Sequence, residues 1–389
     1  MSEVAQAPHS SPDGRIPQLR FPEFDGVWES RLLKDAVKIN PRSGELPDEF
    51  IYIDLESVKK GYLIKETQIN KIGAPSRAQR LLNKNDVIFQ TVRPYQKNNY
   101  FFNLDGDYVA STGYAQLRVL NSPEFLYQAL HTDRFVYDVM ARSTGTSYPA
   151  INSTDLSKIK LNLPTKPEQQ KIAAFLTAVD TKIEQLSTKQ VLLGEYKKGL
   201  MQQIFSQAIR FKADDGSDFP DWKEKKLGDI LDYEQPTNYI VDSTEYDNSF
   251  DMPVLTAGKS FVLGYTNETH KVFENIPVII FDDFTTANKY VDFPFKVKSS
   301  AMKILKPKDS FVNIRLIFEF IQMLNFPIGE HKRYWISEYQ DLKIPFPSFE
   351  EQTKIASFLS SIDNKIEQVG KQLDESKQFK KALLQQMFV

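Results

Sequence analysis

The chain has 389 residues, a formal net charge of −2 and no cysteine. Its length suffices for two domains, and without cysteine it can form neither a disulfide nor a cysteine-based zinc site. The four histidines show no metal-ligand spacing, and we find no membrane-spanning apolar run and no signal peptide, so we expect a cytoplasmic protein that binds no metal and no membrane. Because the net charge is nearly balanced, any nucleic-acid-binding face must gather its basic residues locally.

The chain begins with a stretch rich in Ser, Pro and Ala, residues 1–15, which we predict to be a disordered leader. A short motif then precedes each of two globular stretches. Its members are Arg20, Phe21, Trp28, Leu33 and Asp35 in the first copy and Arg210, Phe211, Trp222, Leu227 and Asp229 in the second. We interpret it as a docking segment whose tryptophans anchor a core.

Residues 16–163 are predicted to form the first domain. Apolar alternation bounded by turn residues predicts several short strands, and a longer apolar periodicity predicts one helix over residues 123–140. The expected strands cover residues 50–55, 86–91, 100–103 and 116–120.

One part of this domain is strongly basic. Between residues 57 and 100 there are nine basic residues and only two acidic ones, with Asn, Gln and Tyr interleaved. Basic side chains hold phosphates, and Arg, Asn and Gln can bond base edges through two hydrogen bonds. A polar loop at 142–148 follows. The predicted DNA-binding residues of the first domain are Lys71, Arg77, Gln79, Arg80, Arg93, Tyr95, Lys97, Asn98, Asn99, Thr144, Thr146, Ser147 and Tyr148.

A long helix is predicted over residues 164–206, and it has a second copy over residues 347–389. A constant offset of 183 aligns the copies without gaps, with 18 identities over the 39 positions from 167 to 205. Apolar residues recur at alternating steps of three and four, which is a heptad stripe. At about 1.5 Å per residue such a helix is a rod of roughly 60 Å. An apolar seam of that length requires a partner.

The second domain, residues 207–346, repeats the plan of the first with different polar residues. Buried strands are predicted at 278–281 and 299–305, and a helix at 314–324. The stretch 229–251 is acidic, so we expect a smaller positive face. The predicted DNA-binding residues here are Lys259, Thr285, Thr286, Asn288, Lys289, Tyr290, His331, Lys332, Arg333 and Tyr334.

The order domain, helix, domain, helix predicts an α+β protein. Two similar domains, each with a mixed β-sheet and helices, would be separated by two long helices paired as an antiparallel coiled coil with pseudo-twofold symmetry. The motifs of common enzymes are missing from the sequence. Gly258-Lys259-Ser260 imitates the end of a phosphate-binding loop, but the first glycine of that motif would fall on Pro253. No residues assemble a nucleophile, a base and an orienting group, so we expect a binding protein without catalytic residues.

The chain resembles the specificity subunit of type I restriction–modification enzymes. The resemblance covers nearly the whole sequence and is most specific in the paired helices, which begin with Pro-x₃-Glu-Gln-x-Lys-Ile-Ala-x-Phe-Leu at Pro164 and end with Lys-Lys-x-Leu-x-Gln-Gln-x-Phe. Thr91-Val92-Arg93-Pro94-Tyr95 and Ser111-Thr112-Gly113-Tyr114 are similar to one type of target-recognition domain of that family.

The resemblance implies a non-catalytic, sequence-specific subunit of a bacterial defence system. Each domain would read one half of a bipartite, asymmetric site in double-stranded DNA, while the helices set the spacer and dock two methyltransferase subunits. Restriction and translocase subunits would join this core. S-adenosylmethionine, ATP and Mg²⁺ would bind those partners and not this chain. Two alternatives remain open: a scaffold that binds proteins, and a DNA methyltransferase or nuclease with an unrecognised site.

Overall fold

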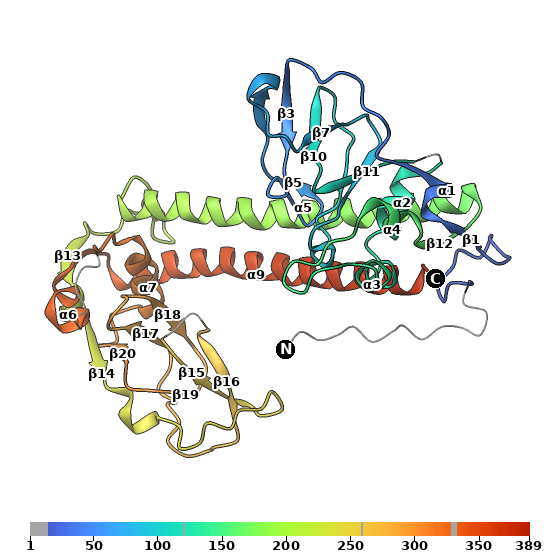
Figure 1. The fold of residues 1–389 in the computed structure, drawn as a ribbon. Coiled ribbons are helices and arrows are strands. Elements are labelled where there is room, and N and C mark those ends of the chain that lie inside the picture. The colour runs from blue at the N-terminus through green and yellow to red at the C-terminus, as the bar shows by residue number, and fades with distance from the viewer. Residues whose placement is uncertain (1–14, 120, 258–259, 328–332) are drawn as a thin grey trace. The chain divides into compact units, whose positions relative to one another are not determined.

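The computed structural model describes residues 15–119, 121–257, 260–327 and 333–389 (Figure 1). The chain divides into two compact units. The first unit contains the residues up to Ser187 together with Gly370–Val389, and the second unit contains Thr188–Val369. The expected leader falls almost entirely outside the described residues.

Two four-stranded sheets form the globular part of the first unit. Their orders are β2-β11-β8-β9 and β6-β3-β10-β7. The strands are β2 (Val37–Ile39), β3 (Glu49–Ile53), β6 (Thr67–Asn70), β7 (Ala78–Leu81), β8 (Asp86–Gln90), β9 (Tyr100–Phe101), β10 (Tyr108–Ser111) and β11 (Tyr114–Val119), with a small hairpin of β4 (Val58–Lys59) and β5 (Tyr62–Leu63). The strands predicted from the sequence are confirmed in place, with shifted ends.

Strand β8 is buried at every residue because both of its faces are covered. Val87 and Phe89 point into one apolar cluster, and Ile88 points into another. Successive side chains of a strand alternate between faces, so this central strand joins two cores.

The single helix predicted over residues 123–140 is wrong. The structure has two helices, α2 (Pro123–Ala129) and α3 (Asp133–Ala141). Thr132 separates them, because its side chain accepts a hydrogen bond from the N–H of Phe135 at 3.2 Å and starts a new helix. The remaining short helices of the first unit are α1 (Leu33–Ala36), η1 (Lys71–Gly73), η2 (Pro94–Gln96) and α4 (Ser153–Ser157).

The second unit repeats this plan with sheets of order β14-β20-β17-β18 and β16-β15-β19. The strands are β14 (Leu231–Glu234), β15 (Met252–Leu255), β16 (Val262–Thr266), β17 (Val278–Asp282), β18 (Asn288–Val291), β19 (Lys296–Val297) and β20 (Met302–Pro307). The helices are α6 (Leu227–Ile230), η3 (Pro236–Tyr239), α7 (Ile314–Met323), α8 (Tyr334–Ser337) and η4 (Tyr339–Asp341). Strand β17 is fully buried, as β8 is.

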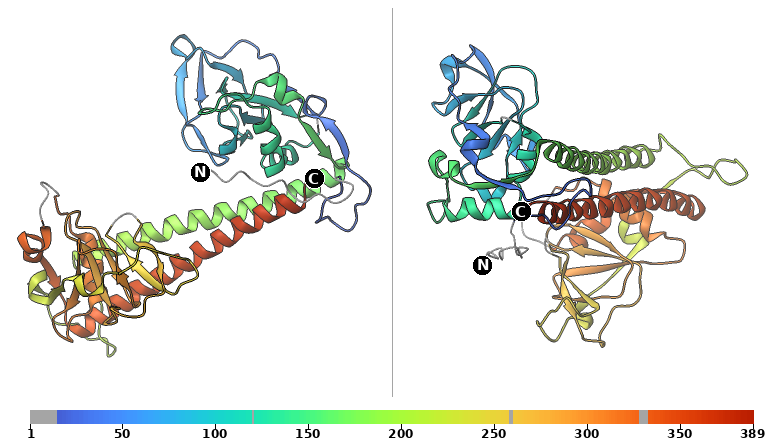
Figure 2. Two further views of the ribbon diagram at one scale, coloured as in Figure 1. Left: turned by 60° about the horizontal axis from the view of Figure 1, so that its bottom comes forward. Right: turned by 90° about the vertical axis from the view of Figure 1, so that its right-hand side faces the viewer.

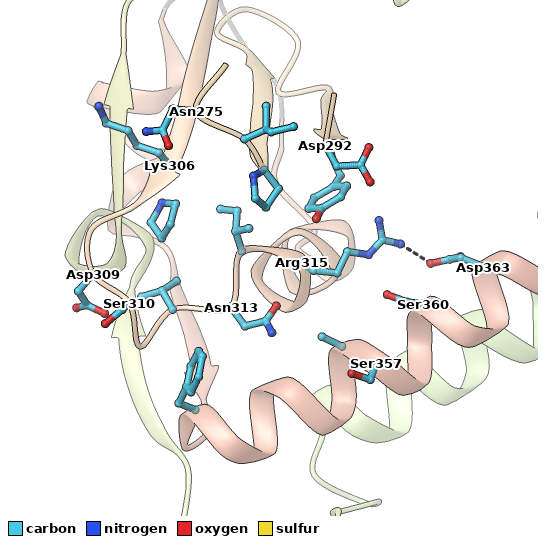
Figure 3. A pocket seen from close by; sticks show the side chains of 18 of the residues that line it. Asn275, Asp292, Lys306, Asp309, Ser310, Asn313, Arg315, Ser357, Ser360 and Asp363 are labelled. Atoms are coloured by element: carbon cyan, nitrogen blue, oxygen red, sulfur yellow. Dashed lines mark hydrogen bonds and ion pairs between the residues drawn. The ribbon is translucent and has the colours of Figure 1, made fainter. Parts of the chain in front are cut away.

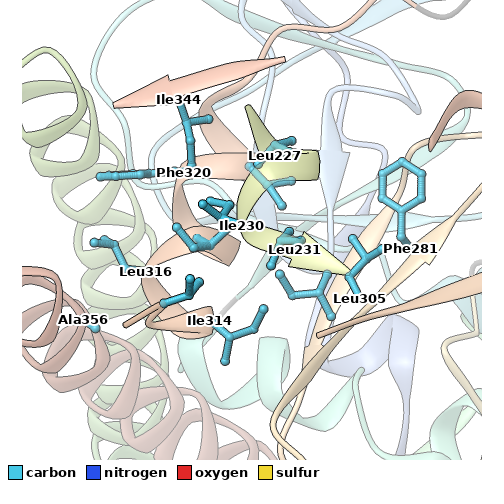
Figure 4. Packing of buried hydrophobic residues seen from close by; sticks show 14 of the residues in the cluster. Leu227, Ile230, Leu231, Phe281, Leu305, Ile314, Leu316, Phe320, Ile344 and Ala356 are labelled. Carbon is cyan, nitrogen blue, oxygen red and sulfur yellow. The ribbon is translucent and has the colours of Figure 1, made fainter. Parts of the chain in front are cut away.

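The main core of the second unit lies between its sheet, α7 and the long helices. Leu316 and Phe320 of α7 are fully buried against Leu231, Phe281 and Leu305 of the sheet side (Figure 4). Ala356 of a long helix belongs to the same cluster. This apolar core thus joins the globular part of the second unit to a long helix.

Each unit also contains a buried ion pair that fastens the docking segment to the start of a long helix. In the first unit both Oε atoms of Glu168 accept hydrogen bonds from Arg20, at 2.7 and 2.8 Å, and Oε1 also accepts one from Trp28 Nε1 at 3.3 Å. In the second unit the same contacts join Arg210, Trp222 and Glu351. A two-stranded sheet lies beside each ion pair: β1 (Glu29–Leu32) with β12 (Lys160–Leu163), and β13 (Lys223–Lys226) with β21 (Lys343–Phe346).

The two long helices are α5 (Lys166–Phe205) and α9 (Phe349–Gln386), close to the predicted boundaries. In the first unit the start of α5 packs against the end of α9, through Ile172 and Leu176 against Leu383 (Figure 2). In the second unit the end of α5 packs against the start of α9, through Ile204 and Leu359. Within each unit the helices therefore run antiparallel.

Ion pairs accompany this packing. In the first unit Lys380 of α9 pairs with Asp180 of α5, and in the second Lys197 of α5 pairs with Asp363 of α9 at 2.8 Å. The α+β class with two domains and long helices is confirmed. No helix among the described residues has the length and apolarity needed to cross a lipid bilayer.

Candidate nucleic-acid interface

Two loops of the first unit meet beyond the end of β8. The C=O of Thr91 accepts a hydrogen bond from Ile151 N at 3.0 Å, and the C=O of Pro149 accepts one from Arg93 N at 2.7 Å. The second loop is closed by Thr144 and Ala150, which exchange two backbone bonds of 2.9 Å. These contacts bring together two stretches that lie about fifty residues apart in the sequence, 91–95 and 144–151.

A stacked pair of side chains lies where the loops meet. The guanidinium carbon of Arg93 is 4.2 Å from the centroid of the Tyr148 ring. Tyr148 is 62% exposed, and Tyr95 of the first loop and Thr146 and Ser147 of the second are exposed too. We call these five residues the Arg93 site.

The Arg93 site is free of negative charge. The loops 92–98 and 143–148 contain no acidic residue. Among the residues that the structure describes, no carboxylate forms an ion pair with Arg93. The guanidinium of Arg93, a half-buried residue, is therefore available to an external acceptor.

Other predicted residues of the same loop point inward. Asn99 is 1% exposed, and its Oδ1 accepts a hydrogen bond from Gln90 N at 2.9 Å. Burial therefore removes Asn99 from the predicted contact residues; it supports the loop from below. Asn98 accepts a hydrogen bond from Lys60 N at 2.9 Å through its Oδ1.

Lys97 is also engaged within the protein. Its Nζ donates to Asp133 Oδ1 at 2.7 Å and to the C=O of His131 at 2.8 Å. Both Arg93 and Lys97 have a left-handed backbone, with φ of 54°. This backbone conformation is uncommon for residues other than Gly, Asn and Asp. Here the hydrogen bonds around the loop hold it in place.

The remaining predicted residues of the first unit lie between β6 and β7 or on β7. Lys71 is ion-paired with Glu45 at 2.7 Å. Arg77 is exposed, while Arg80 is half-buried, and burial lowers the pKa of Arg80. Gln79 donates to the C=O of Ser76 at 2.7 Å.

Arg77 is connected to the Arg93 site through the turn between β10 and β11. Its C=O accepts a hydrogen bond from Thr112 N at 2.9 Å, and the C=O of Gly113 accepts one from Thr91 N at 3.0 Å. Two backbone hydrogen bonds thus connect Arg77, through this turn, with the loop that carries Arg93.

The second unit has a counterpart at the end of β17. The C=O of Asp283 accepts a hydrogen bond from Tyr334 N at 2.8 Å, which corresponds to the bond between Thr91 and Ile151. The turn from β17 to β18 is closed by Asp282, whose Oδ1 accepts from the N–H groups of Phe284 and Thr285 at 2.8 and 3.2 Å. Thr285 and Lys289 are exposed on this hairpin.

Several predicted residues of the second unit serve the fold. Asn288 bonds the C=O of Thr286 and also pairs with Gln322. Tyr290 is half-buried under the guanidinium of Arg315, 4.7 Å from its ring centroid, and burial raises the pKa of Tyr290.

The predicted stretch 331–334 is only partly described. Arg333 is exposed, but Tyr334 is 1% exposed, so burial removes Tyr334 from the predicted contact residues. The predicted residues Lys259, His331 and Lys332 lie outside the described residues.

The two counterpart faces differ in charge. Where the first unit has Gln90 and Thr91, the second has Asp282 and Asp283. Lys303 lies buried beneath Asp283, with 3.7 Å between Nζ and Oδ2, and burial lowers the pKa of Lys303. Both aspartates are buried, so the smaller positive face expected from the acidic stretch 229–251 stays a prediction.

A groove of about 980 Å³ in the second unit lies between α7, β18 and the first turns of α9 (Figure 3). In Figure 3 Arg315 points across it to Asp363, and Arg315 also pairs with Glu319 at 3.0 Å. Its lining contains four acidic residues and two basic ones: Asp292, Asp309, Asp363 and Glu367, with Lys306 and Arg315.

One group among the described residues has a metal-like arrangement. The ligand atoms of Asp242, Glu268 and His270 lie within 4.8 Å of one another. Lysines already pair with both carboxylates: Lys271 with Asp242 at 2.9 Å and Lys296 with Glu268 at 2.8 Å. These contacts explain the cluster without a cation.

The sequence did not predict the hydrogen bonds of the Asn and Gln side chains or the burial of the acidic residues. Pairing of Gln90 with Gln96, at 3.0 Å, depends on a turn whose geometry the residue types do not specify. The glycine of the loop 144–148 could have indicated a tight turn from the sequence alone. Gly145 has φ of +92°, and an added Cβ would lie 3.0 Å from the C=O oxygen of Tyr148.

Fold and site together define a protein of two α+β domains that share one plan and are carried on long helices. A family model described as the type I restriction modification DNA specificity domain matches residues 26–193 and 220–376. These matches cover most of the chain, so the protein belongs to this family.

Individual relatives match in part. The specificity subunit of the type I restriction enzyme EcoR124I/EcoR124II of Escherichia coli is 49% identical over 141 residues, 35% of each chain. A putative type I restriction enzyme MjaX specificity subunit of Methanocaldococcus jannaschii is 25% identical over 276 residues, 60% of each chain. The chain thus spans between about a third and two thirds of the length of these relatives.

Solved structures agree in fold. The type I restriction–modification S subunit from M. genitalium superposes with a TM-score of 0.65 at 17% identity, covering 96% of this chain and 99% of that chain. A chain from a structure of a type I R-M system gives a TM-score of 0.52 at 22% identity, covering 92% of this chain and 96% of that one.

Proposed function

We propose that this protein is the DNA specificity subunit of a type I restriction–modification enzyme. The observation that carries the proposal is the Arg93 site: an exposed, acid-free meeting of two loops with an uncommitted arginine, within a domain of the DNA specificity family. The first unit would read one half of a bipartite site, and the second would read the other half through its β17–β18 hairpin.

DNA fits the Arg93 site better than a protein partner does. Arginine, hydroxyl groups and tyrosine supply donors for phosphates and base edges, and the neighbouring Arg77 adds charge. Arginine and tyrosine are also enriched in protein interfaces, so the preference for DNA rests on the membership of this domain in the DNA specificity family.

The long helices would set the spacing between half-sites and dock two methyltransferase subunits, with restriction and translocase subunits joining through that core. S-adenosylmethionine, ATP and Mg²⁺ would be bound by those partners. The chain itself would carry out no chemistry.

The experiment is methylated-base mapping in a methylation-free host that expresses this chain with its cognate methyltransferase subunit. The structure supplies exchange boundaries, because entry to and exit from each globular part are hydrogen-bonded: Leu33 N to Ile159 O at 2.8 Å, and Leu227 N to Leu342 O at 2.9 Å. Exchange of residues 33–159 for those of a relative should alter only the first half of the methylated sequence.

Exchange of residues 227–342 is the matched control, and it should alter only the second half. Both exchanges leave the pairs Arg20–Glu168 and Arg210–Glu351 and the sequences of the long helices intact. A soluble, associated pair of subunits that methylates no bipartite sequence would overturn the proposal and favour a protein-binding scaffold. Methylation by the purified chain alone would favour an enzyme instead.

A further inference from the structure

We propose that Arg93, held over the ring of Tyr148, reads a guanine in the first half-site through the N7 and O6 acceptors of its major-groove edge. This inference rests on the proposed function and adds to it the base and the residue that recognises it.

The first step is that Arg93 is held in one orientation before any ligand arrives. Its N–H donates to the C=O of Pro149 at 2.7 Å and its C=O accepts from Gln96 N at 3.0 Å, so the backbone on both sides of its Cα is fixed. The Tyr148 ring, 4.2 Å away, supports the guanidinium. A planar donor fork held in this way loses little side-chain freedom when it binds a planar acceptor pair.

The second step is that the other candidate readers are engaged. Adenine is recognised by the oxygen and the NH₂ group of one Asn or Gln together. In the first unit's basic stretch, the Asn and Gln residues nearest to Arg93 in the sequence, and Gln79, bond within the protein. The engaged atoms are Oε1 of Gln90 with Asn98 N (3.3 Å), Oε1 of Gln96 with Gln90 Nε2 (3.0 Å), Oδ1 of Asn98 with Lys60 N (2.9 Å), Oδ1 of Asn99 with Gln90 N (2.9 Å) and Nε2 of Gln79 with Ser76 O (2.7 Å).

The third step concerns cytosine and phosphate. Cytosine offers an amino donor and is read by a carboxylate, but the loops 92–98 and 143–148 contain none. A phosphate can also accept two hydrogen bonds from an arginine, so the experiment below separates a phosphate contact from a guanine contact; Lys97, the nearest lysine in the sequence, is paired with Asp133 at 2.7 Å. What the site presents is a free, oriented double donor, and guanine is the base with two adjacent acceptors.

The test uses the complex of this chain with its methyltransferase subunit and the duplex found by mapping. Each G·C pair of the first half-site is replaced in turn by A·T, and separately each guanine by 7-deazaguanine, which lacks N7. Binding of the unaltered complex should fall about 5- to 150-fold at one G·C pair. 7-Deazaguanine at that position should also weaken binding.

Arg93→Lys keeps the charge and loses the double contact, so it should bind the original duplex more weakly and no longer distinguish G·C from A·T there. Tyr148→Phe, which keeps the ring, should retain discrimination, whereas Tyr148→Ala should reduce it. The matched control is Arg31→Lys, an exposed arginine on β1 paired with Glu29, which should retain full discrimination. Unchanged discrimination in the second half-site verifies that each variant is folded.

Two results would overturn the inference while the proposed function stands. One is a bipartite site whose first half has no guanine sensitive to loss of N7. The other is an Arg93→Ala variant that weakens binding equally for all sequences and lowers the salt dependence, which indicates a phosphate contact. Failure of the unaltered complex to recognise any bipartite sequence would refute the proposed function itself.

Discussion

The buried ion pair at the start of α5 provides the sharpest test of how the first unit is held together. Glu168 has a side chain that is 1% exposed, and Arg20 satisfies it through two hydrogen bonds, with a third from Trp28. Arg20→Ala removes two of these bonds and leaves a carboxylate buried without its counter-charge. Breaking a buried pair in this way costs about 3–5 kcal/mol.

The loss should be local, because the ion pair attaches the segment before Trp28, which also packs through Phe21 on Phe175 and pairs Glu23 with Lys171. Its backbone contacts include Leu19 N to Gln386 O at 2.9 Å and Trp28 N to Arg15 O at 3.0 Å. The assay is hydrogen exchange of the amides between residues 15 and 28. If the whole penalty of about 3–5 kcal/mol favours opening of this segment, exchange should accelerate about 10²- to 4 × 10³-fold, since 1.4 kcal/mol is a factor of ten.

Two further variants complete this test. Arg20→Met combined with Glu168→Leu replaces the pair by apolar groups and should recover much of the protection, because no charge remains buried. Arg31→Ala, which breaks the exposed pair with Glu29, should leave exchange unchanged. If Arg20→Ala exchanges no faster than Arg31→Ala, the ion pair does not hold the segment.

Three other predictions concern separate parts of the protein. Gly145→Ala places a side chain at φ of +92° and 3.0 Å from a carbonyl oxygen, so the loop 144–150 should lose about 1–3 kcal/mol of local stability, measurable as faster amide exchange there and contradicted by unchanged exchange. His131 Nδ1 donates to the C=O of Tyr127 at 2.6 Å, and burial lowers the pKa of His131 to about 4, below its usual 6.5. The unfolded chain thus binds a proton that the folded chain does not bind, and stability should fall as pH drops from about 6.5 to 4. His131 is partly exposed, so we expect it to account for about 1–2 kcal/mol of the stability lost at low pH. In His131→Gln that part of the loss should be absent. A variant with the same pH profile of stability as the parent would contradict this role of His131. Leu316→Ala leaves a cavity in the second unit's core and should cost about 2–5 kcal/mol in thermal or urea unfolding, whereas a cost below that of an exposed Leu192→Ala control would show that the core is not as described.

Much of the architecture could be predicted from the sequence, because it depends on patterns that repeat. The two long helices follow from a heptad stripe and an offset of 183, and their observed bounds, 166–205 and 349–386, lie close to those expected. The buried strands β8 and β17 follow from apolar runs of β-branched and aromatic residues. The prediction of a single helix over 123–140 was wrong, because a threonine cap begins a second helix within a continuous apolar periodicity.

For the candidate site, the sequence by itself determined composition: a basic stretch with few acids, a second polar loop and an acidic second domain. Only the tertiary structure decided which of those residues face outward. It joins Arg93 to Tyr148, turns Asn99 and Tyr334 inward, and pairs Lys97 with Asp133. The reason is physical: periodicity records which face of an element is apolar, whereas hydrogen bonds between distant loops depend on backbone turns that many sequences can adopt.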